Sequence, residues 1–263
     1  MIDEIRGEYF KGICDFSLGS EIPSASNLVM YADLQKYEEA LSVIQQNSHI
    51  KFKLVTHNGD ETVKQVELPD NLVRWYTQNL NFKHPKVEPI PIGLENKHWH
   101  PHKDEILDNK PTFHSRVFKS FAQFNPFTHT EERITLLNLI NGEQIAADIF
   151  RCVNGTDYDL FVSNLRSYTF CLCPQGNGID THRIWEALYM GCVPVVKNCA
   201  AHDFNYGHID NMNKNKLPII FIDDWLQLTN DFLERQYNRI NMGAFNSEML
   251  SMTYWKDKIK CWK

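Results

Sequence analysis

The sequence predicts an α/β protein built from two halves, each with a mostly parallel sheet. Short apolar runs, typical of buried strands, alternate with amphipathic stretches typical of helices, which indicates βαβ units. A polar, His-rich segment with two prolines, residues 95–115, separates these runs into two groups and is the candidate linker. The chain has 263 residues, enough for one large domain or for two of about 110–150 residues each.

The first half is expected to begin with a strand at 28–31, followed by an amphipathic helix over 34–46. Charged and apolar residues alternate at 51–56, and the run ends in His-Asn-Gly-Asp, which predicts a strand followed by a loop. Further along, 73–80 is expected to be helical and 87–93 to form a short strand that ends at a loop.

Strands and helices continue to alternate in the second half. The strands are expected at 116–124, 168–173, 193–196 and 217–222. The helices are expected at 131–141, 157–167, 224–242 and, at the C-terminus, 247–262. Because ligands of such sheets bind at the carboxyl ends of strands, the loops after the strands are the places to look for a site.

The most informative segment is 168–196, which is expected to form a strand, a glycine loop, a helix and a second strand. The Gly-Asn-Gly at 176–178 leaves the backbone free to turn sharply and to approach a ligand closely. Asp180 or Thr181 is expected to cap the helix, and Gly191 to end it. A strand, a glycine loop and a helix N-terminus together favour an anion site, most often for phosphate. The loop has neither the P-loop lysine nor GxGxxG spacing, which disfavours a dinucleotide-dependent oxidoreductase.

Polar side chains on this helix predict how a ligand is held. His182, Arg183 and Glu186 are spaced so that all can face the loop. A guanidinium beside a helix N-terminus suits a diphosphate, and a carboxylate one turn further on suits the vicinal hydroxyls of a ribose. The alternative is an exposed Arg183–Glu186 pair worth a few tenths of a kcal/mol.

Other candidate residues lie after other strands. Arg133, at the start of the 131–141 helix, can reach a phosphate or can pair on the surface with Glu132. In the first half, Asp60 and Glu95 each follow a strand, where a carboxylate at the mouth of a cleft can serve as a general base, and His57 lies beside Asp60. Asn-Gly-Asp is also ordinary turn chemistry, which is the alternative reading of Asp60.

Composition excludes several classes of protein. With 43% hydrophobic and 23% charged residues, the chain has the composition of a soluble globular protein. A net charge of −6 argues against a general nucleic-acid binder. No apolar run is long enough to span a membrane, and the acidic, polar N-terminus is unlike a signal peptide, so the expectation is a soluble cytoplasmic protein.

No bound metal is expected. The seven cysteines are scattered without the spacing of zinc ligands, and Cys171 and Cys173 are expected to pack in the core. The histidines of the linker (His98, His100, His102 and His114) could suggest metal binding, but such a run in a polar segment is more often solvated.

The segment CPQGNGIDTHRIWEALYMGCVPVV resembles the nucleotide-sugar-binding segment of exostosin-like glycosyltransferases. The segments LVTHNGD, PIGLENKHW and FNPFTHTEER look like those of small, compact exostosin-like transferases, including ones carried by large DNA viruses of algae. The first segment is also similar to the donor region of α1,3-fucosyltransferases. The resemblance is specific at 171–196 and looser before residue 115.

The resemblance implies a GT-B fold, in which two Rossmann-like domains with parallel sheets face a central cleft. Residues 1–112 would form the acceptor-side domain and 113–245 the nucleotide-sugar-binding domain, with 246–263 as a C-terminal helix packing back on the first domain. The implied activity is transfer of a sugar from a nucleoside-diphosphate sugar to a glycan acceptor. A UDP-sugar is favoured, with UDP-xylose as a specific candidate, and the reaction is expected to be inverting and to need neither metal nor other cofactor.

By position, Arg133 and Arg183 would hold the diphosphate and Glu186 the ribose. The donor site as a whole is expected to comprise Arg133, Gly176, Asn177, Gly178, Asp180, Thr181, His182, Arg183 and Glu186. Asp60 is the first candidate for the catalytic base and Glu95 the second, and His57 is also expected at the catalytic site. The alternative function is a non-catalytic nucleotide-sugar or carbohydrate-binding protein with the same fold. The sequence does not specify the acceptor or the oligomeric state.

Overall fold

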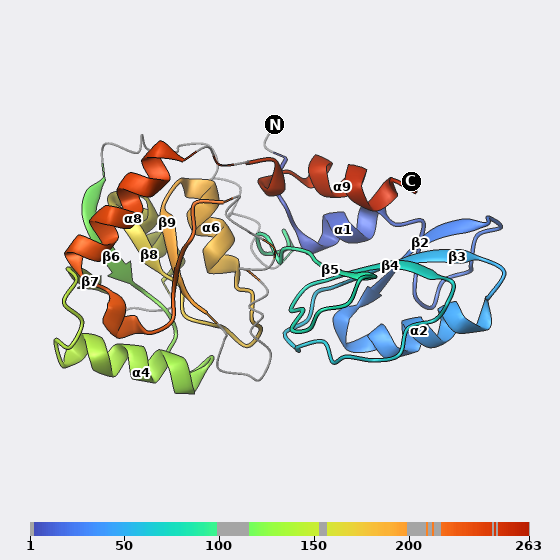
Figure 1. Ribbon diagram of the computed structural model, residues 1–263, viewed down its shortest axis with the longest axis horizontal. Coiled ribbons are helices and arrows are strands. Elements are labelled where there is room, and N and C mark those ends of the chain that lie inside the picture. The colour runs from blue at the N-terminus through green and yellow to red at the C-terminus, as the bar shows by residue number, and fades with distance from the viewer. Residues whose placement is uncertain are drawn as a thin grey trace.

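The computed structural model describes residues 3–98, 116–152, 157–198, 209, 212, 217–243, 245 and 247–262. Within these residues the chain forms two sheets, each of five parallel strands, with helices packed on their faces (Figure 1). The predicted α/β class with two parallel sheets is therefore confirmed. The domain limit between 112 and 113 falls outside the described residues and stays a prediction.

The strands of the first sheet follow one another in space as they do in the sequence. They are β1 (Phe16–Ser17), β2 (Asn27–Asp33), β3 (Lys51–His57), β4 (Leu72–Thr77) and β5 (Val87–Pro89). Helix α2 (Tyr37–Gln46), which follows the short 3-10 helix η1 (Leu34–Lys36), covers one face. Helices α1 (Gly7–Ile13) and α9 (Met252–Lys260) lie together on the other (Figure 1).

Coverage on both faces explains the continuous apolar run of β2. Leu28 and Met30 pack in the cluster that includes Ile44 of α2, whereas Val29 and Tyr31 pack in the cluster that includes Phe10 of α1. Successive side chains of a strand point to opposite faces, so a strand between two helical layers needs apolar residues at every position.

The prediction of a helix at 73–80 is wrong, because residues 73–77 belong to strand β4. Its backbone pairs with β3 on one side and with β5 on the other, and Trp75 and Tyr76 are buried on opposite faces of the sheet. A short apolar run is compatible with a buried strand and with a helix segment. In this protein the stretch forms a strand because its backbone pairs with β3 and β5.

The second sheet has the strand order β10-β9-β8-β6-β7. Its strands are β6 (Val117–Ala122), β7 (Ile149–Arg151), β8 (Tyr168–Leu172), β9 (Val193–Lys197) and β10 (Ile220–Ile222). The helices of this half are α4 (Thr130–Asn141), α5 (Tyr158–Ser167), α6 (His182–Met190) and α8 (Asn230–Met242). All four predicted strands and the helices at 131–141 and 157–167 are confirmed. The predicted 224–242 helix is divided into a 3-10 turn, η4 (Trp225–Gln227), and α8.

The glycine-loop unit has the predicted layout. The loop leaves β8, Thr181 is the N-cap of α6, and Gly191 ends α6 in the left-handed region with φ of +72°. Thr181 makes no side-chain capping bond to the helix. Glycine adopts this backbone conformation at little cost, which is why the helix ends here and β9 can begin.

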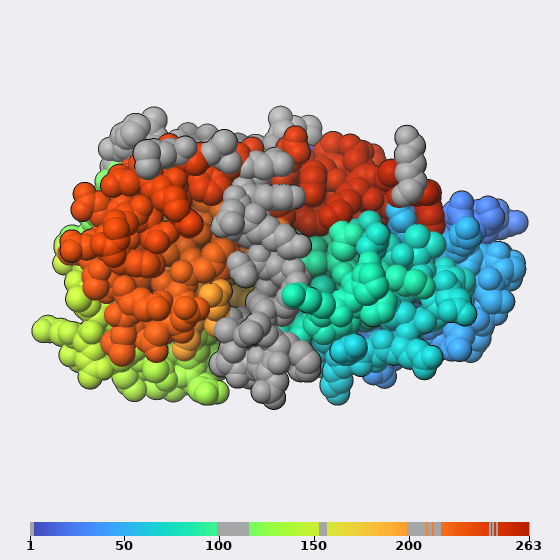
Figure 2. All heavy atoms as spheres, viewed as in Figure 1, coloured from blue at the N-terminus to red at the C-terminus, as the bar shows by residue number. Residues whose placement is uncertain are grey.

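The C-terminal segment leaves the second half and packs on the first. After η5 (Ser247–Leu250), α9 lies beside α1, and the Tyr76 hydroxyl of β4 donates a hydrogen bond to the Lys258 carbonyl at 3.3 Å. The space-filling view shows this segment, in red, against the teal and cyan surface of the first half (Figure 2).

The carboxyl edges of the two sheets face each other. Hydrogen bonds connect the loops at these edges, among them Asn177 Nδ2 to Asp60 Oδ2 at 3.1 Å, the Ile92 N–H to Asp180 Oδ2 at 2.7 Å, and His182 Nδ1 to the Gly93 carbonyl at 2.8 Å. Any site built from these loops therefore takes side chains from both halves.

Candidate functional site

A cleft of about 480 Å³ lies between the facing edges of the two sheets. Eleven of the twelve residues predicted for the site line it, and only His57 does not. They are Asp60, Glu95, Arg133, Gly176, Asn177, Gly178, Asp180, Thr181, His182, Arg183 and Glu186. The fold therefore collects into one space residues that are more than a hundred positions apart in the sequence.

The cleft lies at a topological switch point of the second sheet. Strand β6 has β7 on one side and β8 on the other, so the connections from β6 and from β8 run in different directions. Open α/β sheets bind ligands at such a point, in the crevice outside the carboxyl ends of the strands. The loops after β6 and β8 supply Asn125, Thr128 and the glycine loop to the lining.

Two arginines come together on this side of the cleft. Arg133, which is 4% exposed, donates from Nε to the Gln175 carbonyl at 2.8 Å and from Nη1 to the Asn125 carbonyl at 2.9 Å. The guanidinium of Arg183 lies over the ring of Phe161, at 5.2 Å from its centroid. Burial, and next the charge of Arg183, lowers the pKa of Arg133 to about 10. The two side chains are thus close enough to repel each other.

No described carboxylate forms an ion pair with either arginine. In addition, Nε of Arg183 and Oγ1 of Thr181 are buried and have no hydrogen-bond partner among the described residues. Buried polar groups are normally paired, and an unpaired one in a cleft is open to a water molecule, an ion or a ligand. Two cations, an unpaired N–H and an unpaired hydroxyl at the N-terminus of α6 form an arrangement suited to an anion.

Glu186 lies one turn into α6 and is 4% exposed. The alternative prediction of an exposed Arg183–Glu186 pair is therefore wrong, because Glu186 is buried. The Tyr158 hydroxyl of α5 donates a hydrogen bond to Glu186 Oε1 at 3.4 Å, and burial, followed by the charge of Glu186, raises the pKa of Tyr158. A buried carboxylate fixed by a phenol is placed to accept hydrogen bonds from the hydroxyls of a ligand.

Asp180 joins the two halves. Its Oδ1 accepts a hydrogen bond from the Trp185 indole at 2.8 Å, and its Oδ2 accepts one from the Ile92 N–H. The side chain is 2% exposed, so Asp180 holds the glycine loop against the segment after β5.

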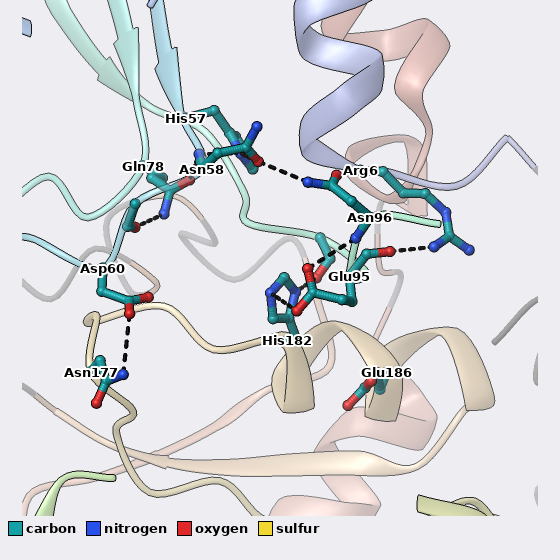
Figure 3. A network of polar contacts seen from close by, with 12 residues as sticks. Arg6, His57, Asn58, Asp60, Gln78, Glu95, Asn96, Asn177, His182 and Glu186 are labelled. Atoms are coloured by element: carbon teal, nitrogen blue, oxygen red, sulfur yellow. Dashed lines mark hydrogen bonds and ion pairs between the residues drawn. The ribbon is translucent and has the colours of Figure 1, made fainter. Parts of the chain in front are cut away.

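Two carboxylates of the first half face the glycine loop and α6 (Figure 3). Asp60 points to Asn177 of the glycine loop, whereas Glu95 Oε2 lies 3.3 Å from His182 Nε2. The other oxygen of Glu95 accepts a hydrogen bond from the Asn96 N–H at 3.0 Å. Both carboxylates therefore stand at the boundary between the halves.

His57 is 1% exposed and lies behind this boundary. Its Nε2 is 3.0 Å from the Pro91 carbonyl, its Nδ1 is 3.1 Å from Asn58 Oδ1, and its ring stacks on Phe10. Burial lowers the pKa of His57 to about 4. With both ring nitrogens occupied, it is a poor candidate for proton transfer to a ligand in the cleft.

Sequence reasoning missed several residues of the site. Arg6 is fully buried and donates to the carbonyl of Glu95, and Tyr158 holds Glu186. Neither belongs to a local pattern, because each reaches the site from a distant part of the chain. Trp185, which anchors Asp180, lies in the helix already singled out, and its place beside the loop could have indicated it.

The structure describes no group of three or more residues able to hold a metal ion, and no helix in the described ranges is long and apolar enough to cross a bilayer. Cys171 and Cys173 are buried, as predicted for core residues. Of the linker histidines, His98 lies with Nδ1 at 4.0 Å from Glu8 Oε2, and the other three fall outside the described residues.

The fold and the cleft define an α/β protein with a cleft between two parallel sheets. Residues 152–261, which include β8, the glycine loop and α6, match the family model described as the RXYLT1 C-terminal domain, of the exostosin-like glycosyltransferase family. The predicted exostosin-like resemblance is thus supported for this part of the chain.

Two curated relatives are plant proteins. The chain is 27% identical over 129 residues to "Probable glycosyltransferase At3g07620" of Arabidopsis thaliana, a match that covers 48% of this chain and 26% of the relative. It is 48% identical over 44 residues to "Probable glycosyltransferase At5g03795" of the same plant, covering 17% of this chain and 8% of the relative. The chain thus spans about a quarter or less of the length of these relatives. The matches support a glycosyltransferase without naming donor or acceptor.

Proposed function

We propose that this protein is a metal-independent glycosyltransferase that takes a sugar from a nucleoside-diphosphate sugar, with its two Rossmann-like halves in the GT-B arrangement. The observation that carries the proposal is the pair of neighbouring arginines beside the N-terminus of α6, the buried Arg133 and the half-buried Arg183. Such an arrangement is unfavourable until an anion neutralises it, and a diphosphate is an anion of suitable charge.

The donor would lie along the edge of the second sheet. Arg133 and Arg183 would hold its diphosphate with the Thr181 hydroxyl, and Glu186 would accept hydrogen bonds from the ribose. The glycine loop, which lines the same cleft, would approach the phosphates and the sugar. A UDP-sugar is favoured, and UDP-xylose is the candidate that the family resemblance suggests. The compact form resembling enzymes of large algal DNA viruses also stays a prediction.

Transfer requires a base at the acceptor. The acceptor hydroxyl oxygen forms a bond to C1 of the donor sugar while the bond between C1 and the phosphate oxygen breaks. The hydroxyl proton passes to a carboxylate, and the electron pair leaves with the nucleoside diphosphate. Asp60 is the proposed base and Glu95 the second candidate, since both lie where the two halves meet. Attack from the face opposite the leaving group inverts C1. Because His57 is buried with both ring nitrogens occupied, we leave it out of the chemistry.

Positive charge for the leaving group would come from the two guanidiniums and the helix N-terminus, so the proposed reaction needs no metal. Asp157 and Asp159 are two residues apart at the start of α5. Carboxylates are typical ligands of Mg²⁺ and Mn²⁺, so the need for a metal is tested directly. Asp157 accepts a hydrogen bond from the Leu160 N–H at 2.9 Å as the N-cap of α5, which gives it a structural task.

The proposal is tested by thermal unfolding with a panel of UDP-, GDP- and CMP-sugars, followed by assays of donor hydrolysis with added EDTA or Mn²⁺. A ligand at a hundred times its dissociation constant adds about 2.7 kcal/mol to stability. The expected result is stabilisation by one nucleotide class and slow, EDTA-insensitive donor hydrolysis. Stabilisation without hydrolysis or transfer to any acceptor would indicate the non-catalytic binding protein, and no stabilisation by any nucleotide sugar would overturn the proposal.

A further inference from the structure

A second chamber, of about 230 Å³, adjoins the cleft on the side of the first sheet. Asp60, Ile92, Glu95 and His182 line both spaces, so the chamber and the cleft meet at the two carboxylates. The chamber lies beyond the carboxyl ends of the first sheet, where ligands of parallel sheets bind. The proposed donor site does not use it.

Three side-chain amides contribute to the polar lining of the chamber. They belong to Gln35, Asn58 and Asn96. Asn96 Nδ2 donates to Asn58 Oδ1 at 3.2 Å, and Asn96 Oδ1 accepts from the Glu8 N–H at 2.9 Å, so the amides of Asn58 and Asn96 are held in fixed orientations. An amide has two N–H donors and an oxygen with two lone pairs, and groups with both functions match hydroxyls, which also donate and accept.

Several contacts hold Asn58 in place at the chamber wall. A Cβ on Gly7 would lie 1.9 Å from Asn58 Oδ1, so the helix α1 approaches the wall at a position that only glycine allows. The Asn58 N–H also donates to Gln78 Oε1 at 2.8 Å, and Asn58 Nδ2 donates to the Tyr31 hydroxyl at 2.8 Å. Asn58 itself adopts φ of +60°, a conformation rare outside glycine.

The charges of the chamber are acidic. Among its described lining residues none is Lys or Arg, and Asp60 and Glu95 carry its carboxylates. His57, which also lines it, is buried and uncharged near neutral pH because burial lowers its pKa to about 4. The positive charges, Arg133 and Arg183, line the cleft and not the chamber. Both spaces contain carboxylates, but only the cleft offers guanidiniums to an anion, so an anion that enters the chamber meets Asp60 and Glu95 without a neighbouring arginine.

We propose that the chamber binds one neutral sugar residue of the acceptor through its hydroxyl groups, and that Asp60 and Glu95 exclude acidic sugars from it. This inference rests on the proposed function and adds the chemical class of the acceptor. It places the acceptor hydroxyl next to the carboxylates that would receive its proton.

The test is binding of two matched pairs of probes, methyl β-galactoside against methyl β-galacturonide and methyl β-glucoside against methyl β-glucuronide. Each pair differs only in a CH₂OH group exchanged for a carboxylate. Saturation-transfer NMR on the full chain gives the dissociation constants. The neutral member of a pair is expected to bind at least about ten-fold more tightly, as repulsion by two nearby carboxylates predicts. In the double variant Asp60→Asn, Glu95→Gln this preference should fall to within about two-fold, since the shapes are kept and the charges removed.

Donor binding, measured separately by thermal unfolding with nucleotide sugars, distinguishes a failure of the proposed function from a failure of the chamber inference. If no nucleotide sugar stabilises the protein, the proposed function fails. If one does, three results would overturn the chamber inference alone: equal or tighter binding of the uronides, an unchanged preference in the double variant, or no binding of any methyl glycoside. A double variant that does not fold is replaced by the single variant Glu95→Gln, for which the preference should still decrease.

Discussion

The side-chain oxygen of Asn79 accepts a hydrogen bond from the backbone N–H of Asp180 at 3.1 Å. Asn79 follows β4 in the first half, and Asp180 ends the glycine loop of the second. The same amide donates from Nδ2 to the Gly59 carbonyl at 3.1 Å, so one buried side chain connects three loops at the cleft. The position of the glycine loop therefore depends on the first sheet as well as on its own.

Gly178→Ala should disturb this contact. A Cβ at this position would lie 2.6 Å from Asn79 Nδ2, and Asn79 is fully buried with both ends of its amide bonded. The expected loss is about 1–3 kcal/mol of unfolding free energy in urea, together with weaker donor binding. The matched control is Gly12→Ala in α1, where nothing lies within 4 Å of the added Cβ. Equal stability of the two variants would show that the loop adjusts freely.

Arg183→Ala should remove a cation and the unpaired Nε from the donor site. Charge-assisted hydrogen bonds are worth about 1.5–3 kcal/mol, so donor affinity in calorimetry should fall at least about ten-fold, with the far-UV spectrum unchanged. Arg235→Ala, at an exposed position of α8, is the control and should bind normally. Normal donor affinity in Arg183→Ala would remove this residue from the donor site.

Asp60→Asn and Glu95→Gln separate the two candidate bases. The variant that lacks the true base should lose about 10²–10⁴-fold in kcat and keep its donor affinity, because general-base catalysis acts on the acceptor proton. The other variant should change less. Measurement of kcat and of donor Kd for both variants decides between them, and full activity in both would place the base elsewhere.

His57 should make stability depend on pH. In the folded protein burial holds its pKa at about 4, below the ordinary 6.5. As the pH falls from about 6.5 towards 4, the unfolded chain takes up a proton that the folded protein does not, so stability decreases, by about 3 kcal/mol in all. Urea unfolding at a series of pH values should show a weaker dependence in His57→Gln than in the exposed control His49→Gln. Identical pH dependence in all three proteins would contradict the assignment.

Lys53→Met should loosen α9. This lysine of β3 is 4% exposed and donates from Nζ to the Ile259 carbonyl at 2.8 Å and to the Cys261 carbonyl, at the C-terminus of α9. Loss of a cation from a helix C-terminus leaves buried carbonyls unpaired, which should cost about 1–3 kcal/mol. Lys51→Met, on the same strand but exposed, should change stability by less than about 0.5 kcal/mol. The comparison is made by urea unfolding, and equal losses in both variants would contradict a specific role of Lys53.

Local sequence signals specify the unit from Tyr168 to Val196. Its strand, glycine loop, helix and second strand depend on apolar runs, on Gly191 and on spacing within one helix, all of which act over a few residues. For the same reason the spacing within the helix predicts that Arg183 and Glu186 face one space, and both line the cleft.

Contacts between distant parts of the chain set which residues face this unit. Val73–Leu80 was predicted as a helix because its apolar residues do not specify a period, and pairing with β3 and β5 made it a strand. The contacts of Asn79 with Asp180 and of Asp60 with Asn177 join residues about a hundred or more positions apart. Such contacts form where the loops at the facing edges of the two sheets meet. Local propensity does not encode which loops meet. The glycine loop is therefore a local feature, whereas the cleft around it is a product of the whole fold.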